Sequence, residues 1–453
     1  MAKKTNSSNQ NLQPSLLMYF IYSFALTIGF LILLPRFLWD ALRKGKYAAG
    51  FWQRFGRLPE FDREGKPVVW LHAVSVGETN AAKPLVKEIL KNFPDYKLVV
   101  STTTKTGQTL AREIFKNDAA LVFYFPFDWS FAVRRALEKI NPSVVLIMET
   151  ELWFNFLREA KRREIKIALV NGRLSEKSFK NYKLIRGFVR RALANLDLAL
   201  MSGESDAERL IELGCAAEKT FVTGNIKFDL ETGKSELTET LRRRFAIDET
   251  RALIIAASTH VPEERWILES YRILRDEFSS ENAPRLLIAP RHPERFAEVA
   301  ELMQNSGFRF ASRSASMSET DVDADLILLD SIGELSAVYE LAELVFVGGS
   351  LIPHGGQNVL EPAAVKKAIV TGFYTMNFAD IIKNLSAKEA IVQLPKLEEN
   401  EISVNLESVF YELLSDNVKR KALAENAFAV LRENRGACAK TIEKLQLLFN
   451  KSA

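Results

Sequence analysis

The sequence predicts an α/β protein built from two doubly wound domains, and three observations lead to this prediction. The chain has 453 residues, too many for one typical domain, so two domains are the natural expectation. Short apolar runs rich in β-branched residues alternate with longer helical patterns along most of the chain. These runs fall into two groups, separated by a polar stretch at residues 229–248. Strands that alternate with helices form parallel sheets covered on both faces.

The N-terminal part of the chain predicts a membrane anchor. Residues 1–15 are expected to be disordered, whereas residues 16–34 carry no charge and reach roughly 28 Å as a helix, about the thickness of the hydrocarbon core. The apolar run is too long for the h-region of a signal peptide, and residues 35–37 are not a small-residue cleavage site. More basic residues follow the run than precede it, so the positive-inside rule places the rest of the chain in the cytoplasm.

The first domain is expected at residues 35–228, a linker region at 229–248 and the second domain at 249–404. The last stretch, residues 405–453, is expected to form helices that cross back to the first domain. Strands are expected at 68–73, 97–103, 120–125, 143–148, 166–170, 198–201 and 221–222 in the first domain. In the second domain they are expected at 252–257, 285–289, 326–329, 344–347, 368–371 and 390–393.

Composition narrows the possible functions. The net charge of +4 is too small to indicate a nucleic-acid-binding protein, and we expect no such partner. The two cysteines lie far apart in the sequence, which excludes a disulfide framework and suits a reducing compartment. No two of the four histidines have metal-ligand spacing, so we expect no metal site.

The strongest functional signal lies at residues 345–362. An apolar strand ends in Gly348, Gly349 and Ser350, and a second glycine pair leads into a helix that opens with Asn358 and holds Glu361 in its first turn. Glycines let backbone approach a phosphate, and the free N–H groups of a helix N-terminus favour negative charge. Glu361 opposes a bare phosphate, but a carboxylate can accept hydrogen bonds from two sugar hydroxyls. Phosphate beside ribose indicates a nucleotide site.

Acidic residues follow two strands of the first domain. Glu78 comes after the strand at 68–73, where it is either a helix cap or a catalytic group. Glu149 and Glu151 follow the strand at 143–148, and either could face the site. Ligands of open α/β sheets bind outside the carboxyl ends of the strands, so these carboxylates can converge as a base and its partner.

Candidate ligands for an anion follow strands of the second domain. Ser258 and Thr259 end one strand, Arg291 and His292 follow the next, and Lys227 lies at the junction of the two domains. On one edge of a sheet, hydroxyl and cationic groups can grip a phosphate or a carboxylate.

A basic and aromatic stretch occupies residues 173–191. It is either a helix that rests on an anionic membrane surface or a helix with one packed and one solvated face. The upstream anchor favours the membrane surface.

Taken in order, these segments resemble the 3-deoxy-D-manno-octulosonic acid (Kdo) transferases of bacterial lipopolysaccharide synthesis. The match runs from the anchor to beyond residue 420. Its most specific pieces are residues 72–78, 148–155, 171–175, 224–229, 290–292 and 348–362.

The resemblance implies the GT-B fold, two Rossmann-like domains that face each other across a cleft. It implies an enzyme of the inner membrane that transfers Kdo from CMP-Kdo to a lipid A precursor (lipid IVA), with inversion and without a metal or other cofactor. It also implies Glu78 as the general base, with Glu149, Glu151 and Arg173 on the acceptor side. The residues implied to bind the donor are Lys227, Ser258, Thr259, Arg291, His292, Gly349, Ser350, Asn358 and Glu361.

Two other functions fit the same residues. A different GT-B enzyme, such as a UDP-sugar transferase or a hydrolysing epimerase, would use a similar glycine loop, because the choice of pyrimidine and sugar depends on few contacts. A non-catalytic, membrane-anchored nucleotide-binding protein would keep the nucleotide site but would not need Glu78.

Overall fold

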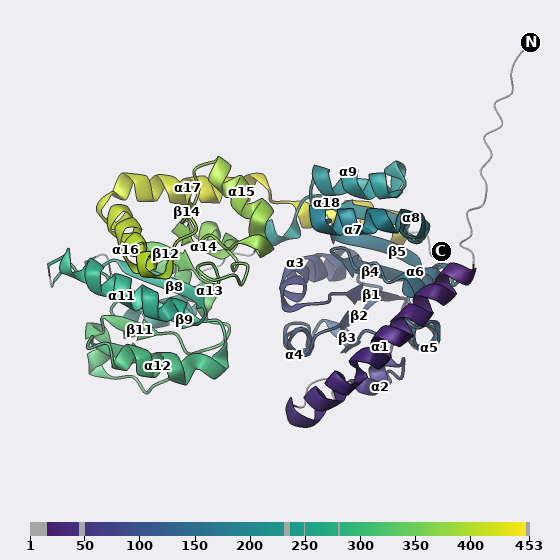
Figure 1. Cartoon of the computed structure of the whole chain (residues 1–453), viewed down its shortest axis with the longest axis horizontal. Helices are drawn as coiled ribbons and strands as arrows, with labels where there is room; N and C mark the ends of the chain where they lie inside the picture. The colour runs from purple at the N-terminus through teal and green to yellow at the C-terminus, as the bar shows by residue number, and fades with distance from the viewer. Residues whose placement is uncertain (1–15, 45–49, 231–235, 249, 280, 450–453) are drawn as a thin grey trace, which may run out of the picture. The chain divides into compact units, whose positions relative to one another are not determined.

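The computed structural model describes residues 16–44, 50–230, 236–248, 250–279 and 281–449 (Figure 1). The chain divides into two compact units, of which unit 1 comprises Met1–Asp229 with Arg435–Ala453 and unit 2 comprises Leu230–Asn434. Each unit contains one seven-stranded sheet with helices, as the predicted fold class requires. The disorder expected for residues 1–15 lies outside the described residues.

The sheet of unit 1 has the strand order β3-β2-β1-β4-β5-β6-β7, and all its strands are parallel. The expected strands of the first domain all form, and the central ones are apolar runs buried on both faces. They are β1 (Val68–His72), β2 (Lys97–Thr102), β3 (Ala119–Tyr124), β4 (Val144–Met148), β5 (Lys166–Gly172), β6 (Leu198–Met201) and β7 (Thr220–Val222).

Helices cover both faces of this sheet. In β1, Val69 and Leu71 point into one core, whereas Val68 and Trp70 point into the other, as alternation along a strand requires. Helices α3 (Val76–Asn92), α4 (Lys105–Ile114) and α18 (Ala437–Phe449) contribute to the first core. Helices α5 (Ser130–Ile140), α6 (Phe154–Lys161), α8 (Arg186–Leu193) and α9 (Glu204–Leu213) contribute to the second. Unit 1 also holds α2 (Phe51–Arg54) and α7 (Glu176–Leu184).

The sheet of unit 2 has the strand order β10-β11-β9-β8-β12-β13-β14 and is also parallel. The edge strand β10 was not expected, because it has three residues, of which only Ala311 is buried. The strands are β8 (Leu253–Thr259), β9 (Arg285–Pro290), β10 (Phe310–Ser312), β11 (Leu326–Leu328), β12 (Leu344–Val347), β13 (Ala368–Thr371) and β14 (Val392–Gln393). The helices are α10 (Glu236–Arg244), α11 (Glu263–Asp276), α12 (Phe296–Gln304), α13 (Leu335–Val338), α14 (Leu360–Ala364), α15 (Ala379–Ala387), α16 (Glu399–Ser415) and α17 (Asn417–Glu433).

The C-terminal helices differ from the expectation. α16 and α17 belong to unit 2, where Leu406 and Phe410 of α16 enter the core, and only the chain from Arg435 onward belongs to unit 1. There α18 ends with the ring of Phe449 stacked on that of Phe93, with 4.0 Å between the ring centroids. The crossing therefore begins about 30 residues later than predicted, because α16 has its own apolar face to bury in unit 2.

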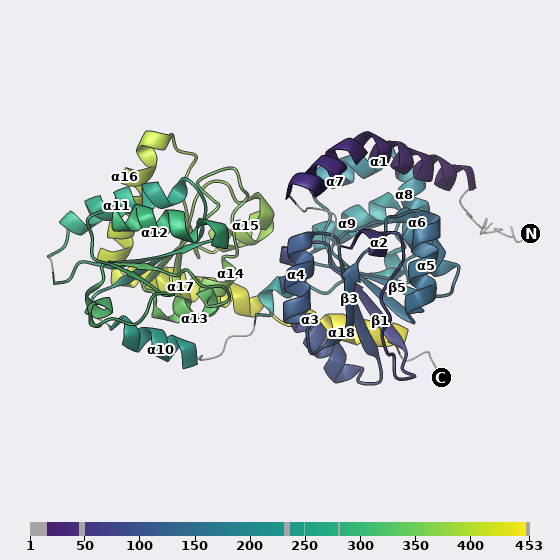
Figure 2. The same ribbon diagram turned by 90° about the horizontal axis from the view of Figure 1, so that it is seen from below.

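Helix α1 (Leu16–Lys44) runs through Pro35 and so extends beyond the predicted 16–34. In the described part of the chain, its segment Leu17–Pro35 is the one helix long and apolar enough to cross a membrane. The two views show α1 lying along the surface of unit 1, beside α8 (Figures 1 and 2).

Candidate active site

Both sheets place the candidate residues at a topological switch point. In unit 1 the strand order reverses between β1 and β4, and in unit 2 between β8 and β12. Open α/β sheets bind ligands at such a point, outside the carboxyl ends of the strands. Glu78 and Glu149 follow β1 and β4, whereas Ser258 and Gly349 lie at the ends of β8 and β12.

Glu78 lies close to the N-cap of α3, which is Ser75, and its pKa is unusual. It lies in the first turn of α3, where its Oε2 accepts the N–H of Val74 at 2.8 Å and its Oε1 accepts the hydroxyl of Ser75 at 2.9 Å. Only 7% of its surface is exposed. Burial first, and then the charge of Glu149, raise the pKa of Glu78 to about 7. A general base works best with its pKa near the operating pH, so the capping geometry and a catalytic role are compatible.

Glu149 and Glu151 lie near Glu78. Both raise the pKa of Glu78, and burial together with Glu149 raises the pKa of Glu151 to about 7. Glu149 has a φ of 53°, a left-handed conformation that is uncommon outside glycine and concentrates at functional sites. The three carboxylates therefore come together in unit 1, as the sequence predicts.

Lys227 lies with these carboxylates. It sits in the 3-10 turn Ile226–Phe228 of unit 1, and its Nζ is 3.1 Å from Oε1 of Glu149. Lys227 was expected to bind the donor together with residues that all lie in unit 2. Lys227 itself lies in unit 1. The physical reason for its position is Asn171, whose Oδ1 accepts the N–H of Ile226 at 3.0 Å and so holds the turn beside the end of β5. Asn171 belongs to one of the segments that resemble the family, at residues 171–175, but no role was expected for it.

Arg173 lies beside the same loop. Its backbone N–H donates to the hydroxyl of Thr150 at 3.1 Å, and its carbonyl accepts from that hydroxyl. These bonds tie the loop after β5 to the loop that carries Glu149 and Glu151. The residues expected on the acceptor side are therefore neighbours along two adjacent strand ends.

The glycine loop of unit 2 is organised by Glu263, which the sequence analysis did not single out. Glu263 is the first residue of α11 and is fully buried. Its carboxylate accepts the backbone N–H groups of Gly349, Ser350 and Leu351 at 2.7–3.0 Å, and that of His260 at 2.9 Å. The available signal was an acidic residue in the first turn of a helix that follows a strand end.

Internal bonds hold the backbone of Gly349 and Ser350, and the donor role expected for these two residues stays a prediction. Their N–H groups are occupied by Glu263, and the Ser350 hydroxyl donates to the Val347 carbonyl at 2.6 Å. Gly348 is required for space, because a Cβ there would lie 2.8 Å from Cα of Thr259 and 2.9 Å from Oε2 of Glu263. Internal bonds and the absence of a side chain at Gly348 therefore set the shape of the loop.

Ser258 and Thr259 have different environments. The Thr259 hydroxyl is fully buried and donates to Oε1 of Glu264 at 2.8 Å, so it serves the protein interior rather than a ligand. Ser258 is partly exposed and has a φ of 55°, the same left-handed conformation as Glu149. Of the two residues, Ser258 is the more exposed, and the donor roles expected for both stay predictions.

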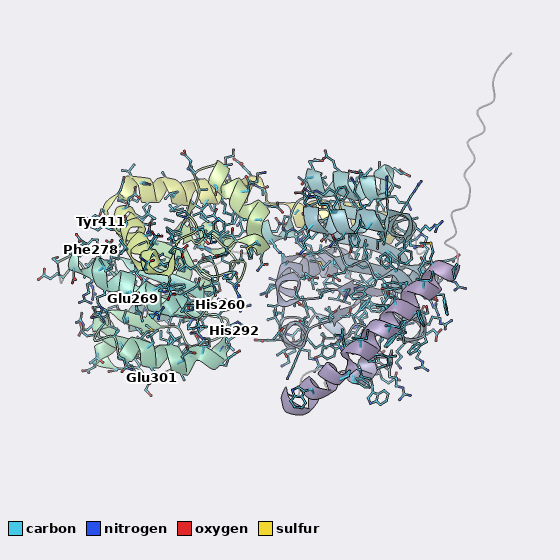
Figure 3. The ribbon with its side chains drawn as sticks, in the orientation of Figure 1. His260, Glu269, Phe278, His292, Glu301 and Tyr411 are labelled. Atoms are coloured by element: carbon cyan, nitrogen blue, oxygen red, sulfur yellow. The ribbon has the colours of Figure 1, made fainter. Side chains whose placement is uncertain are left out.

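Three histidines meet at this end of unit 2. His260 follows β8, His292 follows β9 and His354 lies in the loop after β12, with their ligand nitrogens within 4.8 Å of one another. Figure 3 shows His260 and His292 side by side at this end. The Nδ1 of His260 donates to the Ser258 carbonyl at 3.1 Å, which leaves Nε2 as a lone-pair donor. Burial and the other two rings lower the pKa of His260 to about 4, so its ring is neutral at pH 7.

A neutral imidazole with a free lone pair can bind zinc or a similar metal, whereas it donates to a phosphate only through an N–H that has no other partner. The spacing of the three histidines in the sequence did not predict that they meet, because they follow three different strands.

Arg291, Asn358 and Glu361 complete the site in unit 2. Asn358 donates to Oε1 of Glu361 at 2.9 Å and accepts the N–H of Leu360 at 3.1 Å. Burial raises the pKa of Glu361, whereas Asn358 and Arg291 act in the opposite direction. Helix α14 begins at Leu360, two residues later than predicted, and has five residues. The predicted cation, amide and carboxylate therefore lie close together beside the histidines.

Comparison with known proteins assigns the family. The chain is 33% identical over 406 residues to the 3-deoxy-D-manno-octulosonic acid transferase of Haemophilus influenzae, a match that covers 90% of this chain and 93% of that protein. The chain belongs to the Kdo transferase family. The transferase is also 30% identical over 431 residues to the corresponding protein of Chlamydia trachomatis, with 94% and 96% of the two chains covered. A family model described as 3-Deoxy-D-manno-octulosonic-acid transferase (kdotransferase) matches its residues 49–230.

Solved structures share the fold of the transferase. The UDP-GlcNAc 2-epimerase of Neisseria meningitidis bound to UDP-GlcNAc has a TM-score of 0.56 at 12% identity, with 84% of this chain and all of that one covered. A glycosyltransferase of Rickettsia africae has a TM-score of 0.55 at 14% identity, with 86% of this chain and all of that one covered. Identities this low show the fold alone. The predicted GT-B fold and the predicted family are both confirmed.

Proposed function

We propose that the transferase moves Kdo from CMP-Kdo to a sugar hydroxyl of a lipid A precursor, lipid IVA, by a single inverting displacement at the inner membrane. One observation carries the chemistry: Glu78 is buried at the switch point of unit 1 with a pKa of about 7, beside Glu149 and Glu151. A carboxylate of that pKa is about half ionised at pH 7, and its ionised form can accept a hydroxyl proton.

The proposed step needs no covalent intermediate. Glu78 takes the proton of the acceptor hydroxyl while that oxygen forms a bond to the anomeric carbon of Kdo. The bond from this carbon to the phosphate oxygen breaks, and its electron pair leaves with CMP. Attack from the face opposite the leaving group inverts the anomeric centre.

In this proposal unit 1 binds the acceptor. Lys227 holds Glu149 through their 3.1 Å ion pair, and Glu149 keeps the pKa of Glu78 high. Arg173 lies beside the same loop and is the cation proposed to meet a phosphate of the lipid headgroup.

Unit 2 binds the donor in the same proposal. Arg291, with His292 and His354, would meet the charge of the phosphate or of the Kdo carboxylate. Glu361 would accept from the ribose hydroxyls, with Asn358 setting its orientation. Ser258 would add a hydroxyl, and the turn at Arg291 and His292 would present backbone to the cytosine.

The decisive experiment incubates the purified transferase with CMP-Kdo and lipid IVA and identifies the product by mass spectrometry, which also counts the Kdo residues added. Glu78→Gln should lower turnover by about 10²–10⁴-fold, the usual contribution of a general base. Glu113→Gln, an exposed position on α4, is the matched control. Near-normal turnover of Glu78→Gln would contradict the assignment of the base.

Nucleotide choice is tested separately. CMP should raise the melting temperature of the transferase and UDP should not, because ligand binding to the folded state stabilises it by mass action. Glu78→Gln should keep the stabilisation by CMP. Equal protection by UDP would favour a UDP-sugar enzyme, and CMP protection without any lipid product would favour a non-catalytic nucleotide-binding protein.

A further inference from the structure

One face of α1 packs against unit 1 through aromatic and polar side chains. Tyr19 is 2% exposed, and its ring lies 5.5 Å from that of Phe188 and 4.1 Å from the guanidinium carbon of Arg158. One turn further along, the hydroxyl of Tyr22 donates to Oδ2 of Asp128 at 2.9 Å. A buried aspartate therefore has a hydrogen-bond partner on the helix predicted to cross the membrane.

The contact continues along the same face. Asn155 donates to the hydroxyl of Ser23 at 3.0 Å, and the indole N–H of Trp129 donates to the hydroxyl of Thr27 at 3.1 Å. The ring of Phe30 meets that of Trp129 edge-on, with 5.0 Å between the ring centroids. Apart from the adjacent pair Tyr22 and Ser23, the α1 residues in these contacts are three or four positions apart, the spacing of one helix face. They are Tyr19, Tyr22, Ser23, Thr27 and Phe30.

The opposite face of α1 is apolar and exposed. Its large side chains keep between 42% and 71% of their surface accessible, far more than the side chains of a helix packed inside a soluble domain. They are Leu17, Phe20, Ile21, Phe24, Ile28, Leu31 and Ile32.

If α1 crosses the bilayer, its polar face cannot stay docked on unit 1 while its apolar face is in contact with lipid. A spanning helix is surrounded by lipid over its apolar length, and keeping its docked face would draw Asp128 and Arg158 into the hydrocarbon, where charged groups are costly. Undocking it instead would remove Tyr22 from Asp128 and expose the ring of Phe188.

We propose that α1 does not span the membrane: it stays docked on unit 1 and lies in the plane of one leaflet, with its exposed face in the acyl chains. The surface beside it fits anionic headgroups. At the break between α7 and α8, Leu184 is 86% exposed and Ile185 is 47% exposed. Exposed cations lie along α7 and α8 on both sides of this pair in the sequence, and they are Lys177, Lys180, Lys183, Arg186 and Arg190. Lys180 and Lys183 also pair with Glu176 and Glu212.

Docking also connects the membrane to the acceptor side. The loop after β4, which carries Glu149 and Glu151, leads directly into Phe154, whose ring lies 5.1 Å from that of Tyr22. A helix in the interface would hold this loop at the leaflet, so that a lipid headgroup could reach it without leaving the bilayer. This consequence alone rests on the proposed function.

The first test locates the N-terminus. S7C adds a cysteine before α1, and the two native cysteines are buried. If α1 is docked, a membrane-impermeant maleimide should leave S7C unlabelled in intact spheroplasts and label it after lysis. If α1 spans with its basic flank inside, S7C is labelled in intact spheroplasts, and that result overturns the proposal.

The second test probes docking in native membranes. S23C with N155C should form a disulfide on mild oxidation, read by peptide mass spectrometry, because the native side-chain atoms are 3.0 Å apart. F24C with N155C is the matched control, because Phe24 lies on the exposed face. If S23C with N155C forms no more disulfide than F24C with N155C, α1 is not docked on unit 1, and this conclusion does not depend on the labelling of S7C. Neither readout depends on transfer activity, so failure here is distinct from failure of the proposed reaction.

Discussion

Replacing Glu149 by Gln should move the acidic limb of the pH profile of kcat/KM to lower pH. Glu78 acts as a base only when ionised, so activity rises as the pH passes through its pKa. That pKa is about 7 because burial, and then the charge of Glu149, oppose ionisation. The amide of the Glu149→Gln variant would carry no charge, and the Lys227 ammonium, no longer neutralised by its partner, would act in the same direction.

The size of the shift follows from the same numbers. The pKa of Glu78 rises from 4.5 to about 7, a displacement of about 2.5 units, and burial is its largest cause. Glu149 is the second cause after burial, and we take its removal to lower this pKa by about one unit, which corresponds to about 1.4 kcal/mol. At pH 6 a base with a pKa near 6 is about fivefold more ionised than one with a pKa near 7. Activity at pH 6, relative to the plateau, should rise by about that factor.

The assay is initial-rate transfer from pH 5 to pH 9, scored by the position of the limb and not by the height of the plateau. Glu151→Gln is the graded control, because Glu151 is the weakest cause that raises the pKa of Glu78, and its shift should be smaller in the same direction. A limb that stays near pH 7 or moves upward in Glu149→Gln would refute the electrostatic reasoning.

Three further outcomes are expected. Glu263→Gln should lower the free energy of unfolding by about 1–3 kcal/mol, because the backbone N–H groups of the glycine loop lose a charged acceptor. In calorimetry, CMP should then no longer raise the melting temperature of the variant. An unchanged free energy of unfolding would contradict this reasoning. Gly348→Ala should cost about 1–3 kcal/mol through overpacking, whereas Gly187→Ala, where nothing lies within 4 Å of the added Cβ, should cost far less; equal losses would refute the steric argument. In titration calorimetry, micromolar zinc should weaken the binding of CMP, because both would occupy the site of the three histidines. His354→Ala should remove this effect of zinc. If zinc leaves the affinity for CMP unchanged, the three histidines do not bind the metal.

Strands were predictable because a strand buried on both faces must be apolar along its whole length, as β1 and β4 are. The same logic failed at β10, where an edge strand of three residues leaves no comparable pattern. It also failed at α16, because periodicity shows that a helix has an apolar face but not which core receives it.

For the site, sequence alone determined which residue types stand at the strand ends, and hence the carboxylates after β1 and β4, the cations after β9 and the glycine loop after β12. Tertiary structure decided their partners: Glu263 occupies the amides of Gly349 and Ser350, and Lys227 pairs with Glu149. Hydropathy likewise marked α1 as apolar, but only packing revealed the face that meets Asp128 and Asn155. The physical reason is the same throughout. Local pattern reports what a segment can bury, whereas hydrogen bonds and charge pairs join residues that are distant in the chain.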